Sequence, residues 1–433
     1  MTERNWAGNH VYRASSLARP RTVPELQELV AGSRRVRALG SRHSFTGLAD
    51  TEGVLVSVAD LAPPRGGPAV VVDAGVRTAT VPAGASYGVV AAELQRQGWA
   101  LAALASLPHI SVGGAVATGT HGSGDRTPSL AAAVAGVELV RADGELVRSA
   151  RGDEGFDGLV VALGALGVLT RVTLDVEPSY PVRQDVYTGL PWSVVEERFD
   201  ELTGAADSVS LFTRFDDRGV FQAWCKSRST QALEDLYGAA RAATTLHMLD
   251  GAPAESVTDQ SGVPGPWLER LPHFRMEFTP SRGAELQSEY LVPRRHALEA
   301  LAALRRLQPR LAPVLQNAEV RTVAADSLWL SGSYGEDVVG FHFTWELDEP
   351  AVYAVLPAVE EALLPLAGRP HWGKCFVATA DDLAPLYPRW GDFRQLRDDL
   401  DPERVFGNVF LDTVLGDTSL GETSLGAGRG AAL

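Results

Sequence analysis

Apolar positions in the first part of the chain recur at spacings that predict short helices and strands. Leu26 and Leu29 follow a helical period, which predicts an amphipathic helix from Thr22 to Ser33. Further helices are predicted from Tyr87 to Gln97 and from Phe156 to Leu163. Valine-rich runs predict strands at Val36–Gly40, Gly53–Val58, Ala69–Val81, Val137–Val140, Glu145–Val147 and Leu166–Leu174. Helices and strands that alternate over short connections are typical of layered α and β structure.

Beyond Pro181 the predicted elements are longer and mix aromatic with polar residues. Helices are predicted from Gln231 to Leu249 and from His296 to Leu307. Strands are predicted at Val209–Phe215, Gly219–Trp224, Phe274–Phe278 and Glu285–Val292, and around Glu319 and His342. Strands interrupted by single helices predict one antiparallel sheet with helices on one face. Helices follow up to Leu400, and the Gly- and Thr-rich tail from Gly416 is expected to be disordered.

Two of the later strands carry polar residues on one face. Asn317, Glu319 and Arg321 alternate with small or apolar residues, and His342 and Thr344 do the same in the next strand. If this face is buried, its charges must be paired or used, because burying unpaired charge is costly. An exposed sheet face is the ordinary alternative in an antiparallel sheet, and the pattern alone leaves both interpretations open.

A glycine-rich segment from Ala105 to Gly124 has the composition of a ligand cradle. Small side chains let backbone N–H groups approach an anion such as a pyrophosphate. Its apolar residues, among them Leu107, Ile110 and Val112, would be wasted in solvent, which argues against an ordinary surface loop. No G-x-G-x-x-G follows a strand, so a dinucleotide would not be held in the Rossmann manner.

A second candidate ligand site lies where the strand at Val36–Gly40 ends. Ser41, Arg42, His43 and Ser44 follow it, which predicts a turn that presents backbone donors and an imidazole. A solvated or capping histidine is the alternative for His43. The neighbouring glycine and serines favour the ligand site.

Length and charge narrow the class of protein. With 433 residues the chain exceeds one ordinary hydrophobic core, so we expect two domains. The net charge of −15 argues against nucleic acid, whose phosphates would repel it. No apolar run approaches the roughly 18 residues of a membrane span, and the N-terminus lacks an apolar signal segment. We therefore expect a cytoplasmic protein with no membrane partner.

The rare residue types carry further information. Cys225 and Cys375 are the only cysteines, and we expect them to be apolar fillers. Lys226 and Lys374 are the only lysines among 39 basic residues, so each is a candidate for a position that needs an ammonium. A metal hydrolase using histidines is a weak alternative, since no H-x-x-x-H pair supports it, and no metal is expected. The histidines considered for it are His109, His121 and His371.

Five motifs in one order resemble a known family. They are Gly40–Ser44, Ser106–Gly124, Glu319-x-Arg321, His342-x-Thr344 and His371–Lys374. Together they resemble the alditol oxidases (xylitol and sorbitol oxidases) of the vanillyl-alcohol-oxidase type of FAD flavoproteins. The likeness runs through the chain to about residue 411 and leaves out only the tail.

The resemblance implies an α+β fold with a two-subdomain FAD-binding domain and a substrate domain whose large antiparallel sheet is flanked by helices. It divides the chain into the FAD-binding domain (1–178), the substrate domain (179–372), a C-terminal return to the FAD-binding domain (373–415) and a flexible tail (416–433). It also implies FAD bound covalently through His43, because a neutral imidazole is a competent nucleophile toward the flavin 8α position. The cradle has no cysteine, so a single tether is expected.

Carried over residue by residue, the resemblance implies two sets of site residues. The substrate site would comprise Ser106, Glu319, Arg321, His342, Thr344 and Lys374, with Ser106, Glu319, Arg321 and Lys374 as the catalytic groups. The residues expected to contact the cofactor are Ala38, Leu39, Gly40, Ser41, Arg42, His43, Ser44, Ser106, Ser111, Gly114, Thr118, Gly119, Thr120, His121, Val168 and Leu169.

The implied reaction is oxidation of the terminal hydroxyl of a linear polyol such as xylitol or sorbitol to the aldose. Hydride would pass to flavin N5, and oxygen would reoxidise the flavin to give hydrogen peroxide, in a monomeric enzyme. Arg321 and Lys374 would stabilise the developing alkoxide, with Glu319 as the expected partner of Lys374. The proton acceptor is open between Lys374 and His342. The alternatives are a sugar-1,4-lactone oxidase or dehydrogenase of the same superfamily, or a non-catalytic flavin-binding protein.

Overall fold

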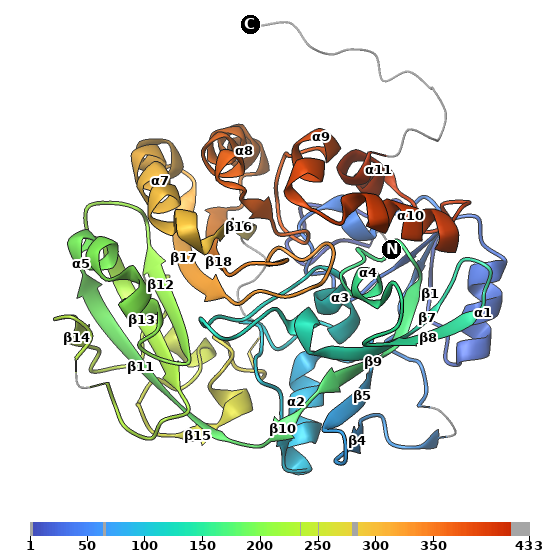
Figure 1. Ribbon diagram of the computed structural model, residues 1–433, viewed down its shortest axis with the longest axis horizontal. Coiled ribbons are helices and arrows are strands. Elements are labelled where there is room, and N and C mark those ends of the chain that lie inside the picture. The colour runs from blue at the N-terminus through green and yellow to red at the C-terminus, as the bar shows by residue number, and fades with distance from the viewer. Residues whose placement is uncertain (1–2, 64–65, 234, 250, 279–284, 417–433) are drawn as a thin grey trace, which may run out of the picture.

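The computed structural model describes residues 3–63, 66–233, 235–249, 251–278 and 285–416. Two blocks of strands lie side by side, with helices along their outer surfaces and further helices between them (Figure 1). The expected disordered tail lies outside the described residues apart from Gly416, which follows the last helix. None of the helices in the described ranges is long and apolar enough to cross a membrane.

The N-terminal block contains two small sheets. Parallel strands in the order β1-β3-β2 form the first: β1 (Ser16–Ala18), β3 (Val54–Val56) and β2 (Val36–Ala38). Antiparallel strands in the order β4-β5-β9-β7-β8 form the second: β4 (Val71–Asp73), β5 (Thr78–Pro82), β9 (Val168–Asp175), β7 (Val134–Val140) and β8 (Leu146–Ala150). A short pair, β6 (Trp99–Ala100) and β10 (Glu177–Pro178), lies where the chain leaves this block.

The helices of this block begin and end at recognisable residues. Helix α1 is capped by the hydroxyl of Thr22, as its sequence predicts, and buries Leu26. Helix α4 is shorter than predicted, because Val161, with a ψ of 78°, leaves helical geometry directly after Val160. The helices are α1 (Val23–Ala31), α2 (Tyr87–Arg96), α3 (Val112–Ala117) and α4 (Phe156–Val160).

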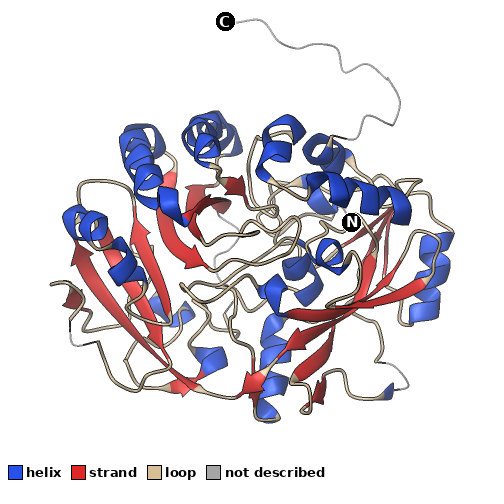
Figure 2. Ribbon diagram, in the orientation of Figure 1, coloured by secondary structure: helices blue, strands red, loops and turns tan. Residues whose placement is uncertain are grey.

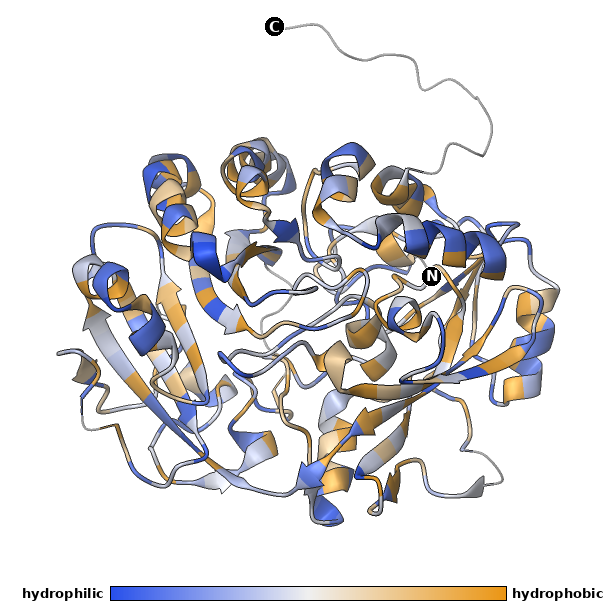
Figure 3. Cartoon of the chain, viewed as in Figure 1, coloured by the Kyte–Doolittle hydropathy of each residue, from blue (hydrophilic) through white to orange (hydrophobic). Residues whose placement is uncertain are grey.

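The second block is a large antiparallel sheet, which confirms the predicted α+β fold. Its strand order is β14-β11-β13-β12-β17-β18-β16-β19, with β15 paired to β11. Apolar and polar residues alternate along several of its strands (Figure 3). The strands are β11 (Pro181–Leu190), β12 (Ser208–Thr213), β13 (Val220–Ser227), β14 (Ala240–Arg241), β15 (Gly265–Pro266), β16 (Glu285–Pro293), β17 (Leu315–Val323), β18 (Val338–Glu346) and β19 (Arg369–Pro370).

Helices cover one face of this sheet, and the other face is turned toward the N-terminal block (Figure 2). Helices α7 and α8 pack on each other and on β16. They bury Leu301, Leu304, Val352 and Leu356, which share the helical faces turned to the core. The helices after the first block are α5 (Trp192–Glu197), α6 (Phe199–Thr203), α7 (Ala297–Leu311), α8 (Glu349–Leu363), α9 (Ala380–Leu383), α10 (Trp390–Leu400) and α11 (Val409–Leu415).

Two predicted elements are wrong. The described residues between Gln231 and Leu249 form turns and the short β14 instead of a helix, because Tyr237 and Gly238 have left-handed φ angles of 52° and 83°. The apolar residues at the end of this stretch pack irregularly against β13. The strand predicted at Phe274–Phe278 is a turn, since only Phe274 forms an isolated bridge and no strand pairs with the residues after it.

The C-terminal segment lies against the N-terminal block. The backbone N–H of Val36 donates to the carbonyl of Val405 at 2.8 Å, and that of Phe45 donates to Gly373 at 2.9 Å. The side chain of Asn408 donates to the carbonyl of Asp50, also at 2.8 Å. These contacts support the C-terminal return, but the residue bounds of the domains stay predictions.

Candidate active site

Two backbone segments of the N-terminal block are hydrogen-bonded to each other in the lining of a cavity. The N–H of Ser41 donates to Ser111 Oγ at 3.3 Å, and the N–H of Ser111 donates to Ser41 Oγ at 3.1 Å. The Ser111 hydroxyl can take this position only opposite a glycine, because a Cβ on Gly40 would lie 2.5 Å from Ser111 Oγ. The glycine-rich cradle and the turn after β2 therefore form one surface.

His43 lies on this surface with its ring stacked on Trp6, at 5.3 Å between ring centroids. Its Nδ1 is buried and has no hydrogen-bond partner among the described residues. Burial lowers the pKa of His43 from 6.5 to about 4, so the imidazole is neutral at physiological pH. The preceding Arg42 adopts a left-handed φ of 66° and pairs with Glu3 at 2.8 Å, which fixes the turn. His43 thus has the chemical state that a nucleophilic tether requires.

One cavity of about 1030 Å³ joins the cradle to the polar face of the large sheet. This volume is at the upper end of the roughly 300–1,000 Å³ of common small-molecule sites, so a large cofactor fits together with a small substrate. Gly119 and Val168 do not line it. The predicted residues that do are Ala38, Leu39, Gly40, Ser41, Arg42, His43, Ser44, Ser106, Ser111, Gly114, Thr118, Thr120, His121, Leu169, Glu319, Arg321, His342, Thr344 and Lys374.

The polar face of β17 and β18 is buried, so the exposed-face interpretation is wrong. Glu319 is 4% exposed and Arg321 5% exposed. Strand register explains how the polar residues meet: Glu319 of β17 lies beside His342 of β18, which lies beside Glu289 of β16. Three strands therefore supply one continuous polar patch.

The carboxylate of Glu289 bridges the two cations of the site. Arg321 Nη2 lies 2.6 Å from Glu289 Oε1, and Lys374 Nζ lies 2.7 Å from Glu289 Oε2. Burial alone would raise the pKa of Glu289, but Arg321 and Lys374 outweigh it and hold that pKa well below its usual range. His121 Nε2 adds a contact of 3.2 Å to Oε1. The predicted pairing of Lys374 with Glu319 is wrong, and Glu289 is its partner.

Lys374 also orients the ring of His342. Lys374 Nζ lies 2.5 Å from His342 Nδ1, and His342 Nε2 lies 3.4 Å from the hydroxyl of Thr344. Burial, reinforced by the charge of Lys374, lowers the pKa of His342 to about 4. The neutral ring therefore accepts from the ammonium at Nδ1 and carries its proton on Nε2.

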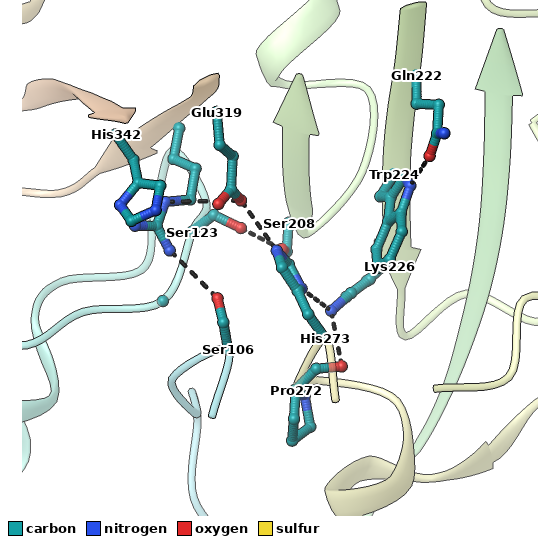
Figure 4. Close-up of polar contacts among 12 residues, drawn as sticks. Ser106, Ser123, Ser208, Gln222, Trp224, Lys226, Pro272, His273, Glu319 and His342 are labelled. Carbon is teal, nitrogen blue, oxygen red and sulfur yellow. Dashed lines mark hydrogen bonds and ion pairs between the residues drawn. The ribbon is translucent and has the colours of Figure 1, made fainter. Parts of the chain in front are cut away.

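Glu319 belongs to a different set of contacts. Its Oε1 lies 2.9 Å from His273 Nε2 and 3.6 Å from Arg321 Nε. Burial raises its pKa, but Arg321 and then His273 outweigh that effect and hold the pKa far below its usual range. Ser106, at the edge of the cradle, has its Oγ 3.5 Å from Arg321 Nη1 (Figure 4). Two carboxylates and two cations thus share one buried site.

Sequence reasoning missed Glu289 and His273. Glu289 lies in a correctly predicted strand, in which Glu285, Gln287 and Glu289 alternate with Leu286, Ser288 and Tyr290, so the signal that marked β17 was present here as well. His273 lies in a turn whose contacts come from residues remote in sequence. The rarity of lysine was a useful signal, since Lys226 is 1% exposed and Lys374 lines the cavity.

Two family models match the chain. The model described as FAD binding domain matches residues 14–150, which include the cradle and the His43 turn. The model described as D-arabinono-1,4-lactone oxidase matches residues 279–414, which include the polar sheet face and Lys374.

Similar proteins extend over nearly the whole chain. An alditol oxidase of Streptomyces sp. is 50% identical over 95% of this chain and 98% of its own length. An L-gulono-1,4-lactone dehydrogenase of Mycobacterium tuberculosis is 32% identical over 95% of this chain and 98% of its own length. The crystal structure of a cholesterol oxidase from B. sterolicum shares the fold, with a TM-score of 0.78, 17% identity and 96% of each chain covered. The chain therefore belongs to the alditol oxidase family of FAD-dependent oxidoreductases of the vanillyl-alcohol-oxidase type.

Proposed function

We propose that this protein oxidises a terminal hydroxyl of a linear polyol, such as xylitol or sorbitol, to the aldose and releases hydrogen peroxide. The observation that carries this proposal is the charge balance of the polar face. Arg321 and Lys374 are matched by Glu289 and Glu319 within contact distance. A site whose charges are already paired suits a neutral ligand with several hydroxyl groups and gives no advantage to a charged one.

The polar face offers complementary groups for a polyol. Arg321 and Lys374 donate hydrogen bonds, Glu319 accepts them, and the hydroxyls of Ser106 and Thr344 do both. As the hydroxyl proton leaves, the fixed cations of Arg321 and Lys374 stabilise negative charge on the alcohol oxygen. They do so without reorganisation, because Glu289 holds both of them in place.

The residues of the cradle fit FAD. Gly40 and Gly114 leave space that a Cβ would fill, and the unpartnered His43 Nδ1 and Asn317 Oδ1 lie in residues that line the same cavity. When bound, FAD supplies the hydride acceptor and passes the electrons to oxygen. We propose that neutral His43 holds it through a covalent bond and that the remaining predicted cradle residues hold it through backbone and hydroxyl contacts.

A sugar-1,4-lactone oxidase or dehydrogenase is the second candidate. It is favoured by the lactone-oxidase family model over residues 279–414 and by the 32% identical lactone dehydrogenase. The higher identity to an alditol oxidase favours the polyol. A monomeric state and a cytoplasmic location stay predictions.

Substrate turnover distinguishes the two candidates. Anaerobic bleaching of the flavin would be followed with xylitol, sorbitol and other alditols, and in parallel with L-gulono- and D-arabinono-1,4-lactone. Peroxide release in air would be measured for the same panel. We expect an alditol to bleach the flavin fastest and to yield peroxide. Faster bleaching by a lactone, or turnover only with an artificial electron acceptor, would contradict the proposal.

A further inference from the structure

The second lysine of the chain is buried behind the polar face. Lys226 lies on β13 and is 1% exposed. Its Nζ lies 2.5 Å from the carbonyl of Leu271, 3.1 Å from that of Pro272 and 3.0 Å from His273 Nδ1 (Figure 4). Three acceptors satisfy the three donors of an ammonium. Lysine is rarely buried in a protein interior, so the burial of Lys226 indicates a role other than that of an ordinary surface charge.

His273 connects this lysine to the substrate cavity. Its Nδ1 faces Lys226, and its Nε2 lies 2.9 Å from Glu319 Oε1. The ring packs against Trp224 and Phe212, at 5.0 and 5.8 Å between centroids, so it cannot turn freely. Its backbone N–H donates to the carbonyl of Ser106 at 3.0 Å, which ties the segment to the cradle. Lys226, His273 and Glu319 thus form a continuous hydrogen-bonded chain.

This series of hydrogen bonds from Lys226 through His273 to Glu319 has two states that differ only in the position of protons. When Lys226 is an ammonium, it donates to Nδ1, and His273 donates its Nε2 proton to Glu319. When Lys226 is a neutral amine, it accepts from a protonated Nδ1, and Nε2 can accept a proton from Glu319 once that carboxylate has taken one up. No heavy atom has to move between these states. Burial lowers the pKa of Lys226 to about 7, with Glu319 opposing and Arg321 reinforcing the shift, so both forms are accessible near neutral pH.

A second cavity leads from this lysine away from the substrate. It has a volume of about 250 Å³ and shares Ser106, His273 and Arg321 with the large cavity. Lys226 lines it as well. Its other lining residues include the exposed Arg126, Asp207 and Arg228, so it reaches the protein surface. Water in this cavity can exchange protons with Lys226 without entering the substrate site.

The other candidate proton acceptors are already engaged. Nδ1 of His342 accepts from Lys374, and Lys374 itself is paired with Glu289. Oε1 of Glu319 accepts from His273, and its Oε2 accepts no hydrogen bond from the described residues. Glu319 is a weak base, but the hydroxyl becomes strongly acidic as hydride leaves its carbon, so a carboxylate suffices to accept the proton.

We propose that Glu319, His273 and Lys226 form a proton relay that carries the alcohol's hydroxyl proton to the second cavity. The proposal rests on the proposed alcohol oxidation. The hydroxyl proton passes to the Glu319 carboxylate, Glu319 protonates Nε2 of His273, and Nδ1 protonates the Lys226 amine. The hydride and its two electrons go to FAD, the alcohol becomes an aldehyde, and the Lys226 ammonium releases one proton to water.

The relay predicts that the rate of flavin reduction depends on pH through the protonation of Lys226. Stopped-flow reduction by saturating xylitol would be measured without oxygen from about pH 5.5 to 9.5, with an indicator dye reporting proton release. In the parent protein we expect the reduction rate to rise through an apparent pKa near 7, with one proton released per flavin in the same phase. The charged groups that face Lys226 are Glu319 and Arg321, and neither changes charge in this range.

Variants at Lys226 distinguish a role of this residue in proton transfer from a purely structural role. Lys226→Arg keeps the cation but cannot act as a neutral base. Lys226→Met removes both the charge and the base. We expect both variants to hold FAD, to lose the rise with pH, and to be reduced about 100-fold more slowly than the parent at high pH. Proton release should lag behind flavin reduction in both.

A control on the same strand tests whether any loss of buried polarity has this effect. Gln222→Leu removes a buried side chain that bonds Trp224 Nε1 at 2.8 Å and lies outside the relay. It should keep the parental pH profile. The parental profile and proton release in Lys226→Arg would overturn the relay. If xylitol and other alditols fail to reduce the parent, the proposed substrate is wrong. The relay is then tested by comparing the pH profiles of the parent and the Lys226 variants with a lactone that does reduce the flavin.

Discussion

Glu289 is a single carboxylate that pairs with two buried cations and stabilises their charged forms. It lies between Arg321 and Lys374, and removing it leaves both buried charges without that partner. Breaking a buried ion pair in this way typically costs about 3–5 kcal/mol of stability. The consequence for Lys374 is specific, because burial already lowers its pKa and Glu289 is the main group opposing that effect.

Glu289→Gln should therefore shift Lys374 toward its neutral form. An ammonium is present below its pKa, so lowering that pKa removes the cation first at high pH. We expect flavin reduction by an alditol to slow down again toward about pH 9 in this variant, whereas the parental rate rises through neutral pH and stays high there. Glu360→Gln is the matched control, since it removes a buried carboxylate that accepts from Tyr290 outside the cavity. A parental profile in Glu289→Gln would contradict this role.

Lys374 itself is expected to act on the alcohol and not on cofactor attachment. Lys374→Met should give yellow protein with covalent flavin whose anaerobic reduction by alditol is slowed about 100-fold or more, because a cation next to the developing oxyanion is lost. The measurement is the limiting rate of bleaching at saturating substrate. Reduction at the parental rate would show that Lys374 has no such role.

His43 is expected to be the only attachment point of the flavin. In His43→Ala, acid precipitation should leave colourless protein and yellow supernatant, because no nucleophile remains for the bond. His109→Ala is the control, since His109 lines the same cavity and its Nε2 lies 2.9 Å from the carbonyl of Met276. It should retain the flavin after denaturation. Flavin that remains on the His43→Ala polypeptide would reject the assignment.

The sequence identified site residues where spacing within one strand was the signal. Glu319 and Arg321 stand out because they alternate with apolar residues, and Lys374 stands out because lysine is rare. Glu289 and His273 act through partners on other strands and turns. Cross-strand register, such as Glu289 beside His342, depends on the tertiary pairing of β16 with β18 and is not a property of either segment alone.

Elements were predictable where periodicity and end signals agreed. Helix α1 has both a helical period and a capping threonine, and its observed start is the predicted one within a residue. The stretch from Gln231 to Leu249 has helix-forming composition, but Gly238 interrupts it and its apolar residues follow no single helical face. Composition without periodicity was therefore a poor guide to the elements at the rim of the large sheet.

The contact between the end of β2 and the cradle predicts that Gly40 cannot be replaced by alanine without loss of cofactor binding. In Gly40→Ala the added Cβ would meet Ser111 Oγ at 2.5 Å, so the Ser111 hydroxyl must turn away and its hydrogen bond from the Ser41 N–H is lost. We expect a lower flavin-to-protein absorbance ratio in this variant. Gly391→Ala is the control, because it adds the same atom to α10 where nothing lies within 4 Å. It should keep full flavin content and a parental or higher melting temperature.

On the scale of the whole molecule, the site depends on segments that lie far apart in the chain. The N-terminal block supplies the cradle, the large sheet supplies the polar face, and the C-terminal segment supplies Lys374. Figure 1 shows these parts meeting at the centre of the molecule. Such a site forms only when the whole chain has folded, so the protonation of its buried groups is coupled to global stability.

The buried histidines predict loss of stability in mild acid. The folded-state pKa values of His273 and His342 are lowered by burial from 6.5 to about 4. Between these two pH values the unfolded chain binds more protons than the folded one, so stability falls as the pH falls. Each pKa unit is worth about 1.4 kcal/mol, which sets an upper bound of about 3.5 kcal/mol for each histidine.

We therefore expect the urea midpoint of the flavin-loaded protein to drop steadily from about pH 6.5 to 4.5. His342→Gln should flatten this drop, because glutamine keeps a polar group at the position and does not titrate. His296→Gln is the control, since this histidine is partly exposed at the start of α7 and lies outside the site. A midpoint in His342→Gln that falls as steeply as in the parent would show that acid acts elsewhere. The carboxylates of Glu289 and Glu319 add to the loss only at lower pH, because their pKa values lie below the usual range.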